Sequence, residues 1–152
     1  MGKTGTATYT VTLDRRDGHV STARARTAVL TVESGSGAEG DTFNPAELLL
    51  AAVGACMLKN IERVAPILKF GFRGVHVEIQ GERRDVPPGF ETITYAVHVD
   101  TDEHDRRLQL LHRNVRQYGT VFNTVAAGTR LSGTLSRGPV HATAPGHADG
   151  ES

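Results

Sequence analysis

The residue with the most evident chemistry is Cys56, the only cysteine, which ends the apolar run NPAELLLAAVGAC. Asn44 offers a side-chain oxygen to free amide groups, and Pro45 suits a first helical position, so the run predicts a helix beginning at Pro45. Apolar residues cover most of its circumference, which indicates burial on most sides. A thiolate is a nucleophile that oxidises stepwise, so Cys56 is a candidate redox residue. A buried structural thiol is the alternative, since free cysteine is among the most buried residue types.

The seven histidines are the other residues with ligand chemistry. His76 and His98 are expected to be cross-strand neighbours, but two imidazoles without a third ligand favour a solvated sheet face over a metal site. His104 and His112 lie two helical turns apart, too far for shared chelation. The glycine-rich segment SGSGAEGD is not followed by the Lys-Ser or Lys-Thr of a phosphate-binding loop. The sequence therefore predicts no metal and no cofactor.

Charge and composition exclude several classes of partner. Lysine plus arginine number 17, as do aspartate plus glutamate, which gives a formal net charge of zero. A nucleic-acid-binding protein normally has a basic excess, so no nucleic-acid partner is expected. The N-terminus lacks a signal-peptide core and no long uncharged apolar segment follows, so no membrane partner is expected. A single cysteine cannot form an internal disulfide, which favours a reducing compartment such as the cytoplasm.

The elements that position Cys56 follow from periodicity. Alternating residues predict strands over 6–13, 19–23 and 28–33, with Asp17 and Gly18 in the first turn. A flexible glycine-rich loop leads to the cysteine helix, expected over 45–64 and ended or kinked by Pro66.

A hairpin is predicted in the middle of the chain, with its turn near Pro87. Alternation there places one apolar row on each strand and puts both rows on the same face, as expected for a sheet with one buried side. The predicted cross-strand pairs are Val75 with Val99, Val77 with Val97, and Ile79 with Tyr95.

The remaining elements are a helix, a helical turn and a strand. Asp102 or a neighbour is expected to cap a helix over 103–117, whose inner stripe contains Leu108, Leu111 and Val115. A helical turn over 121–127 and a strand over 129–136 follow. The order of elements predicts an α+β fold in one domain over residues 1–137, with a disordered tail over 138–152.

The helix motif ending at Cys56, followed by a hairpin, a helix and VFNTV, resembles the OsmC/Ohr family of thiol-dependent hydroperoxide reductases. The resemblance covers most of residues 6–136 in the order of elements. It implies antiparallel sheets around long central helices in an intertwined homodimer, with active sites at the subunit interface. Such a dimer would explain a helix that is apolar on more sides than one small sheet can bury.

The resemblance also assigns roles to individual residues. Cys56 matches the cysteine that attacks the peroxide and becomes a sulfenic acid. Arg16, or the adjacent Arg15, matches a loop arginine that lowers a thiol pKa and steadies developing charge. Glu47 is the nearest match to a catalytic glutamate, although the family pattern N-P-E puts that residue one position earlier, a rotation of about 100° on a helix. Gly119 occupies the position of the second, resolving cysteine, so an intramolecular disulfide is impossible.

Two functions remain open on these residues. The first is a single-cysteine hydroperoxide reductase of oxidative-stress defence, with Cys56, Arg16 and Glu47 as catalytic residues and an external thiol as reductant. The second is a non-catalytic homodimer that binds a small apolar or thiol ligand at its interface. A turn role for Arg16 and a helix-start role for Glu47 are the structural alternatives. A structural subunit of a larger assembly is a third hypothesis.

Overall fold

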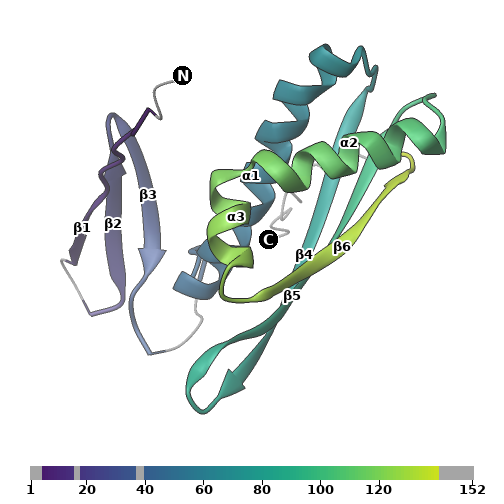
Figure 1. Cartoon of the computed structure of the whole chain (residues 1–152). Helices are drawn as coiled ribbons and strands as arrows, with labels where there is room; N and C mark the ends of the chain where they lie inside the picture. The colour runs from purple at the N-terminus through teal and green to yellow at the C-terminus, as the bar shows by residue number, and fades with distance from the viewer. Residues whose placement is uncertain (1–4, 16–17, 37–39, 141–152) are drawn as a thin grey trace, which may run out of the picture. The chain divides into compact units, whose positions relative to one another are not determined.

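The computed structural model describes residues 5–15, 18–36 and 40–140. Its chain divides into two compact units, Met1–Leu49 and Leu50–Ser152. Each unit has its own three-stranded sheet (Figure 1). The presence of both helices and sheets confirms the predicted α+β class. The expectation of one domain over 1–137 stays a prediction. Among the described residues, no helix is long and apolar enough to cross a membrane.

The sheet of the first unit consists of β1 (Thr12–Arg15), β2 (Val20–Ala25) and β3 (Ala28–Glu33) in the order β1-β2-β3. The third strand has its predicted bounds. β1 is shorter than the predicted strand over 6–13, because its partner β2 ends at Ala25. A tight turn follows β2, in which Arg26 has a φ of 56°. Thr12 pairs with Arg24. Within the described residues, the chain before Val11 therefore has no strand beside it, and residues 6–11 are not a strand.

The sheet of the second unit has the order β4-β5-β6, with β4 (Gly74–Asp85), β5 (Pro88–Asp100) and β6 (Arg130–Arg137). The three predicted hairpin pairs are confirmed, as is the pairing of His76 with His98. β6 pairs with β5 in parallel, unlike the antiparallel sheets that the family resemblance implied. The helical connection between β5 and β6 provides the crossover that a parallel pair requires.

The described residues also form three helices: α1 (Pro45–Leu68), which belongs to the second unit from Leu50 onward, α2 (Asp105–Tyr118) and α3 (Thr120–Ala126). α1 continues beyond the predicted end at residue 64 and contains Pro66, because the surrounding turn is packed into the core through buried Val64 and Ala65. α2 starts later than predicted, with His104 as its N-cap residue. The carboxylate of Asp102 binds Arg73 instead of capping the helix.

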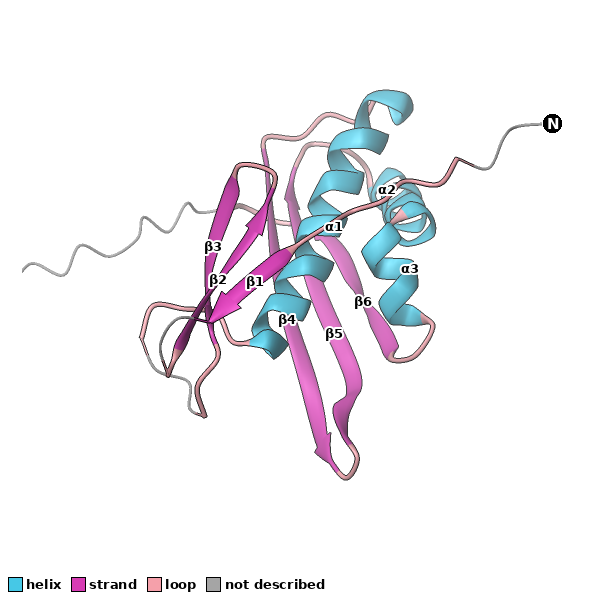
Figure 2. Cartoon of the chain, turned by 90° about the vertical axis from the view of Figure 1, so that its left-hand side faces the viewer, coloured by secondary structure: helices cyan, strands magenta, loops and turns pink. Residues whose placement is uncertain are grey.

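The helices cover the apolar face of the β4-β5-β6 sheet (Figure 2). A Cβ added to Gly54 of α1 would lie 3.1 Å from Ile79 Cδ1, so the helix backbone packs closely on β4. Tyr95, which pairs with Ile79, contacts the rings of His112 on α2 and Phe122 on α3. The predicted inner stripe of α2 is confirmed, since Leu108, Leu111 and Val115 are all buried. This packing brings the middle of α1 beside the end of α2.

Candidate active site around Cys56

Cys56 lies in the middle of α1 as a partly exposed free thiol, packed against the core of the second unit. One helical turn later stands Asn60, whose side chain is buried with 7% of its surface exposed. Its amide nitrogen Nδ2 donates to the backbone oxygen of Val115 at 3.3 Å and lies 4.0 Å from Cys56 Sγ. A buried amide therefore joins α1 to α2 directly beside the thiol.

Gly119 also lies beside the thiol of Cys56. It is buried between α2 and α3, and a Cβ added there would lie 2.8 Å from Cys56 Sγ and 2.7 Å from Asn60 Nδ2. The φ of Gly119 is −84°, which any residue adopts, so the close approach and not the backbone conformation requires glycine here. Positions 56 and 119, which the family resemblance matches to the peroxide-attacking and the resolving cysteine, are thus adjacent in the fold.

Glu47 takes part in a capping box at the start of α1. The backbone nitrogen of Asn44 donates to its carboxylate at 2.9 Å, and its own backbone nitrogen donates to Asn44 Oδ1 at 2.8 Å. These two reciprocal bonds satisfy amide groups that the first turn leaves free. The structural alternative for Glu47 is therefore realised, and its role in catalysis stays a prediction.

Two variants distinguish the capping role of Glu47 from its predicted catalytic role. Glu47→Ala removes the box and is expected to lower the free energy of unfolding by about 0.5–1 kcal/mol, because one capping bond is lost. Glu47→Gln keeps a side-chain acceptor and is expected to preserve stability. Urea unfolding measures both, with Glu62→Ala, on the exposed surface of the same helix, as control. A stable Glu47→Gln protein that loses activity would show that the carboxylate charge is catalytic.

The predicted catalytic Arg16 lies outside the described residues. Its neighbour Arg15 ends β1 with an exposed side chain, and its guanidinium lies 3.5 Å from the backbone oxygen of Gly18. Arg16 as a partner of Cys56 stays a prediction.

Sequence reasoning missed Asn60. A residue four positions after Cys56 on a helix shares its face, so the spacing alone could have drawn attention to this amide. Its second bond, to a carbonyl 55 positions later, has no signal in the sequence.

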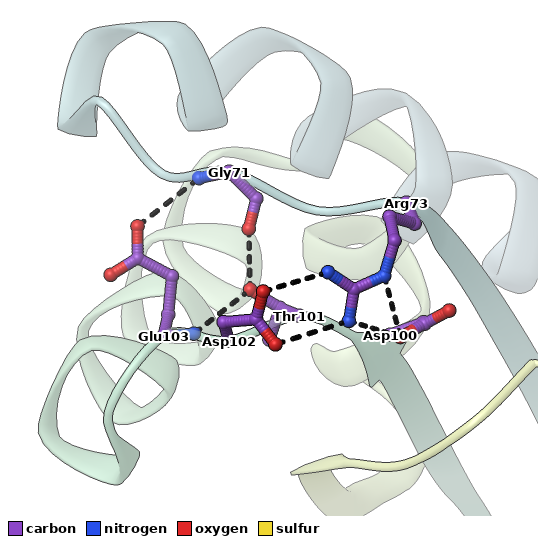
Figure 3. A network of polar contacts seen from close by, with 6 residues as sticks. All are labelled: Gly71, Arg73, Asp100, Thr101, Asp102 and Glu103. Carbon is purple, nitrogen blue, oxygen red and sulfur yellow. Dashed lines mark hydrogen bonds and ion pairs between the residues drawn. The ribbon is translucent and has the colours of Figure 1, made fainter.

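A separate polar cluster joins the two chain segments that enter β4 and leave β5 (Figure 3). Arg73 binds Asp100 at 2.7 Å and Asp102 at 2.9 Å, and these bonds raise the pKa of its guanidinium and lower that of the Asp102 carboxyl. Thr101 Oγ1 donates to the Gly71 oxygen, while the Gly71 nitrogen donates to Glu103. Because its charges are paired with one another, we interpret this cluster as structural: it stabilises the end of the hairpin where β4 begins and β5 ends.

Comparison with protein families identifies the class. The model of the family described as OsmC-like protein matches residues 37–132, more than half of the chain, and the chain belongs to this family. The matched region includes Cys56, Asn60 and Gly119. No curated protein matches the chain.

Solved structures share the fold at low sequence identity. The OsmC-like protein of Mycoplasma pneumoniae has a TM-score of 0.80 and 16% identity, covering 86% of this chain and 97% of that one. The organic hydroperoxide resistance protein OhrB of Bacillus subtilis has a TM-score of 0.63 and 18% identity, covering 85% and 98%. An organic hydroperoxide resistance protein from Elizabethkingia anophelis, with thiocyanate bound, has a TM-score of 0.69 and 17% identity, covering 89% and 99%.

Proposed function

We propose that this protein is a single-cysteine hydroperoxide reductase that uses an external thiol. The observation that carries the proposal is the partly exposed thiol of Cys56, flanked by the Asn60 amide and by Gly119. Membership of the OsmC-like family supports it, because similar folds include organic hydroperoxide resistance proteins.

The chemistry requires no cofactor and proceeds in balanced steps. The Cys56 thiolate attacks one oxygen of ROOH, so an S–O bond forms, the O–O bond breaks, and the alkoxide leaves and takes up a proton as ROH. An external thiol then attacks the sulfenic sulfur, which releases water and forms a mixed disulfide. A second external thiol releases the Cys56 thiolate and a small-molecule disulfide. Gly119 makes the external thiol necessary, since residue 119 provides no second sulfur.

We assign supporting roles to Arg16 and Glu47. The guanidinium of Arg16 would stabilise the thiolate and the negative charge on the departing oxygen. The Glu47 carboxylate would orient that guanidinium. Cys56 supplies the nucleophile, and its free thiol suits a reducing compartment, which we propose is the cytoplasm.

We further propose that the protein is a homodimer. One face of the small sheet in the first unit exposes large apolar side chains, with Leu13 60% and Leu30 43% exposed. A three-stranded sheet needs a covered face for stability, and a second copy would supply that cover. Sedimentation equilibrium is expected to give twice the chain mass of 16.3 kDa. Leu13→Glu with Leu30→Glu is expected to shift the equilibrium toward monomer, whereas Thr12→Glu with Thr31→Glu, on the other face of the sheet, is not.

The proposed activity is tested by consumption of an organic hydroperoxide with a panel of thiols. We expect turnover with at least one monothiol or dithiol and no turnover without a thiol. The absence of consumption with every thiol would overturn the proposal.

A non-catalytic binding role is the second candidate, and two positions favour it. Ala46 stands where the family pattern has its glutamate, and Gly119 stands where it has the second cysteine. A protein of this kind would bind a small apolar or thiol ligand at the subunit interface without oxidising Cys56. Saturable ligand binding without hydroperoxide consumption would support it.

A further inference from the structure

The outer surface of α2 holds a concave site separate from Cys56. Its volume is about 330 Å³, and it is lined by Gln109, His112, Arg113 and Arg116. These positions follow the i, i+3, i+4, i+7 spacing of one helix face, so a regular helix holds all four side chains together. No acidic side chain lines the site.

The two arginines of this site are uncompensated. Arg73, Arg83, Arg107 and Arg137 each form an ion pair with a carboxylate. Within the described part of the chain, neither Arg113 nor Arg116 does. In a protein of zero net charge, this leaves local positive charge in a concavity.

The imidazole of His112 is fixed at the base of this helix face. Its Nε2 lies 2.7 Å from the hydroxyl of Tyr95, and the two rings meet edge to face with centroids 5.7 Å apart. Burial lowers the pKa of His112, and Arg116 lowers it further, so the ring is neutral at pH 7. Burial raises the pKa of Tyr95, which keeps its hydroxyl protonated. One hydrogen bond therefore holds the His112 ring against Tyr95, and the tautomer of the ring sets which of the two groups donates.

We infer that Gln109, His112, Arg113 and Arg116 form a binding site for a phosphate group. Gln109 offers an amide N–H₂, and Arg113 and Arg116 offer two guanidinium groups, so three of the four lining residues carry N–H donors whatever the tautomer of His112. Guanidinium groups match the oxygens of phosphate through paired, charge-assisted bonds. A phosphate presents more acceptor oxygens than a carboxylate, which suits a site lined by several N–H donors. This site is independent of the proposed activity of Cys56.

Isothermal titration calorimetry with inorganic phosphate tests the inference, at an ionic strength held constant with sodium chloride. The wild-type protein is expected to show saturable binding, and Arg113→Gln with Arg116→Gln is expected to weaken it about tenfold or more. Arg106→Gln is the matched control, because Arg106 is an exposed residue of α2 that does not line the site. It is expected to leave the affinity unchanged.

Three further results would overturn the inference: no saturable phosphate binding by the wild-type protein, an equal loss of affinity in Arg106→Gln, or equal affinity for acetate. A titration of Cys56→Ser separates this site from the proposed function. Unchanged phosphate affinity in that variant is expected, whatever the hydroperoxide assay shows.

Discussion

Cys56→Ser is expected to abolish thiol-dependent hydroperoxide reduction. A serine hydroxyl is almost fully protonated at pH 7 and cannot form the sulfenic acid on which turnover depends. Because removal of a catalytic nucleophile leaves only binding effects, we expect a rate loss of about 10³-fold or more. The measurement is the initial rate of hydroperoxide loss with the best thiol of the panel.

A neighbouring substitution controls for the introduced hydroxyl. Ala55 precedes Cys56 on α1 and is exposed, so Ala55→Ser adds the same group to the same helix without touching the thiol. It is expected to retain wild-type activity and stability. If Cys56→Ser instead keeps the wild-type rate, the thiol is structural, and any hydroperoxide consumption arises elsewhere.

Gly119→Cys is expected to create an intramolecular disulfide with Cys56. A Cβ at position 119 would lie 2.8 Å from Cys56 Sγ. In a disulfide with an S–S bond of about 2.05 Å, the Cβ of one cysteine lies about 3 Å from the far sulfur, so the backbone spacing is nearly correct. Under one equivalent of hydroperoxide, we expect the variant to lose both free thiols, as counted by alkylation and intact mass.

Asn60 limits how readily this disulfide forms. Its Nδ2 would be 2.7 Å from the new Cβ, so the amide must shift, and overpacking of this kind costs about 1–3 kcal/mol. Gly119→Cys with Asn60→Ala is therefore expected to form the disulfide faster than Gly119→Cys alone. The matched control is Gly128→Cys, since a Cβ at Gly128 meets nothing within 4 Å. If both thiols of the double variant stay free under oxidation, positions 56 and 119 are not adjacent in solution.

Strong local patterns predicted much of the fold. Alternation along the β4–β5 hairpin fixed its register, because a slip of one residue would have moved every apolar side chain to the wrong face. The end of α1 was missed because burial of Val64 and Ala65 outweighs the bond that Pro66 removes. The parallel pairing of β6 with β5 was also missed, since it depends on how two intervening helices pack.

Only those residues of the candidate site that belong to a local sequence motif were predicted. Cys56 and Gly119 came from short sequence motifs, and the fold brings them together. The Asn60–Val115 and Tyr95–His112 contacts could be found only in the structure, because each joins residues on different elements. Side-chain contacts of this kind have no spacing rule that a sequence can display.

Trapping of the oxidised thiol tests the central claim most directly. The wild-type protein is treated with one equivalent of organic hydroperoxide in the presence of dimedone, and its intact mass and peptide map are measured. We predict a single dimedone adduct located on Cys56, and none when a reducing thiol is added first. An unmodified Cys56 after the hydroperoxide has been consumed, or no consumption at all, would contradict the account.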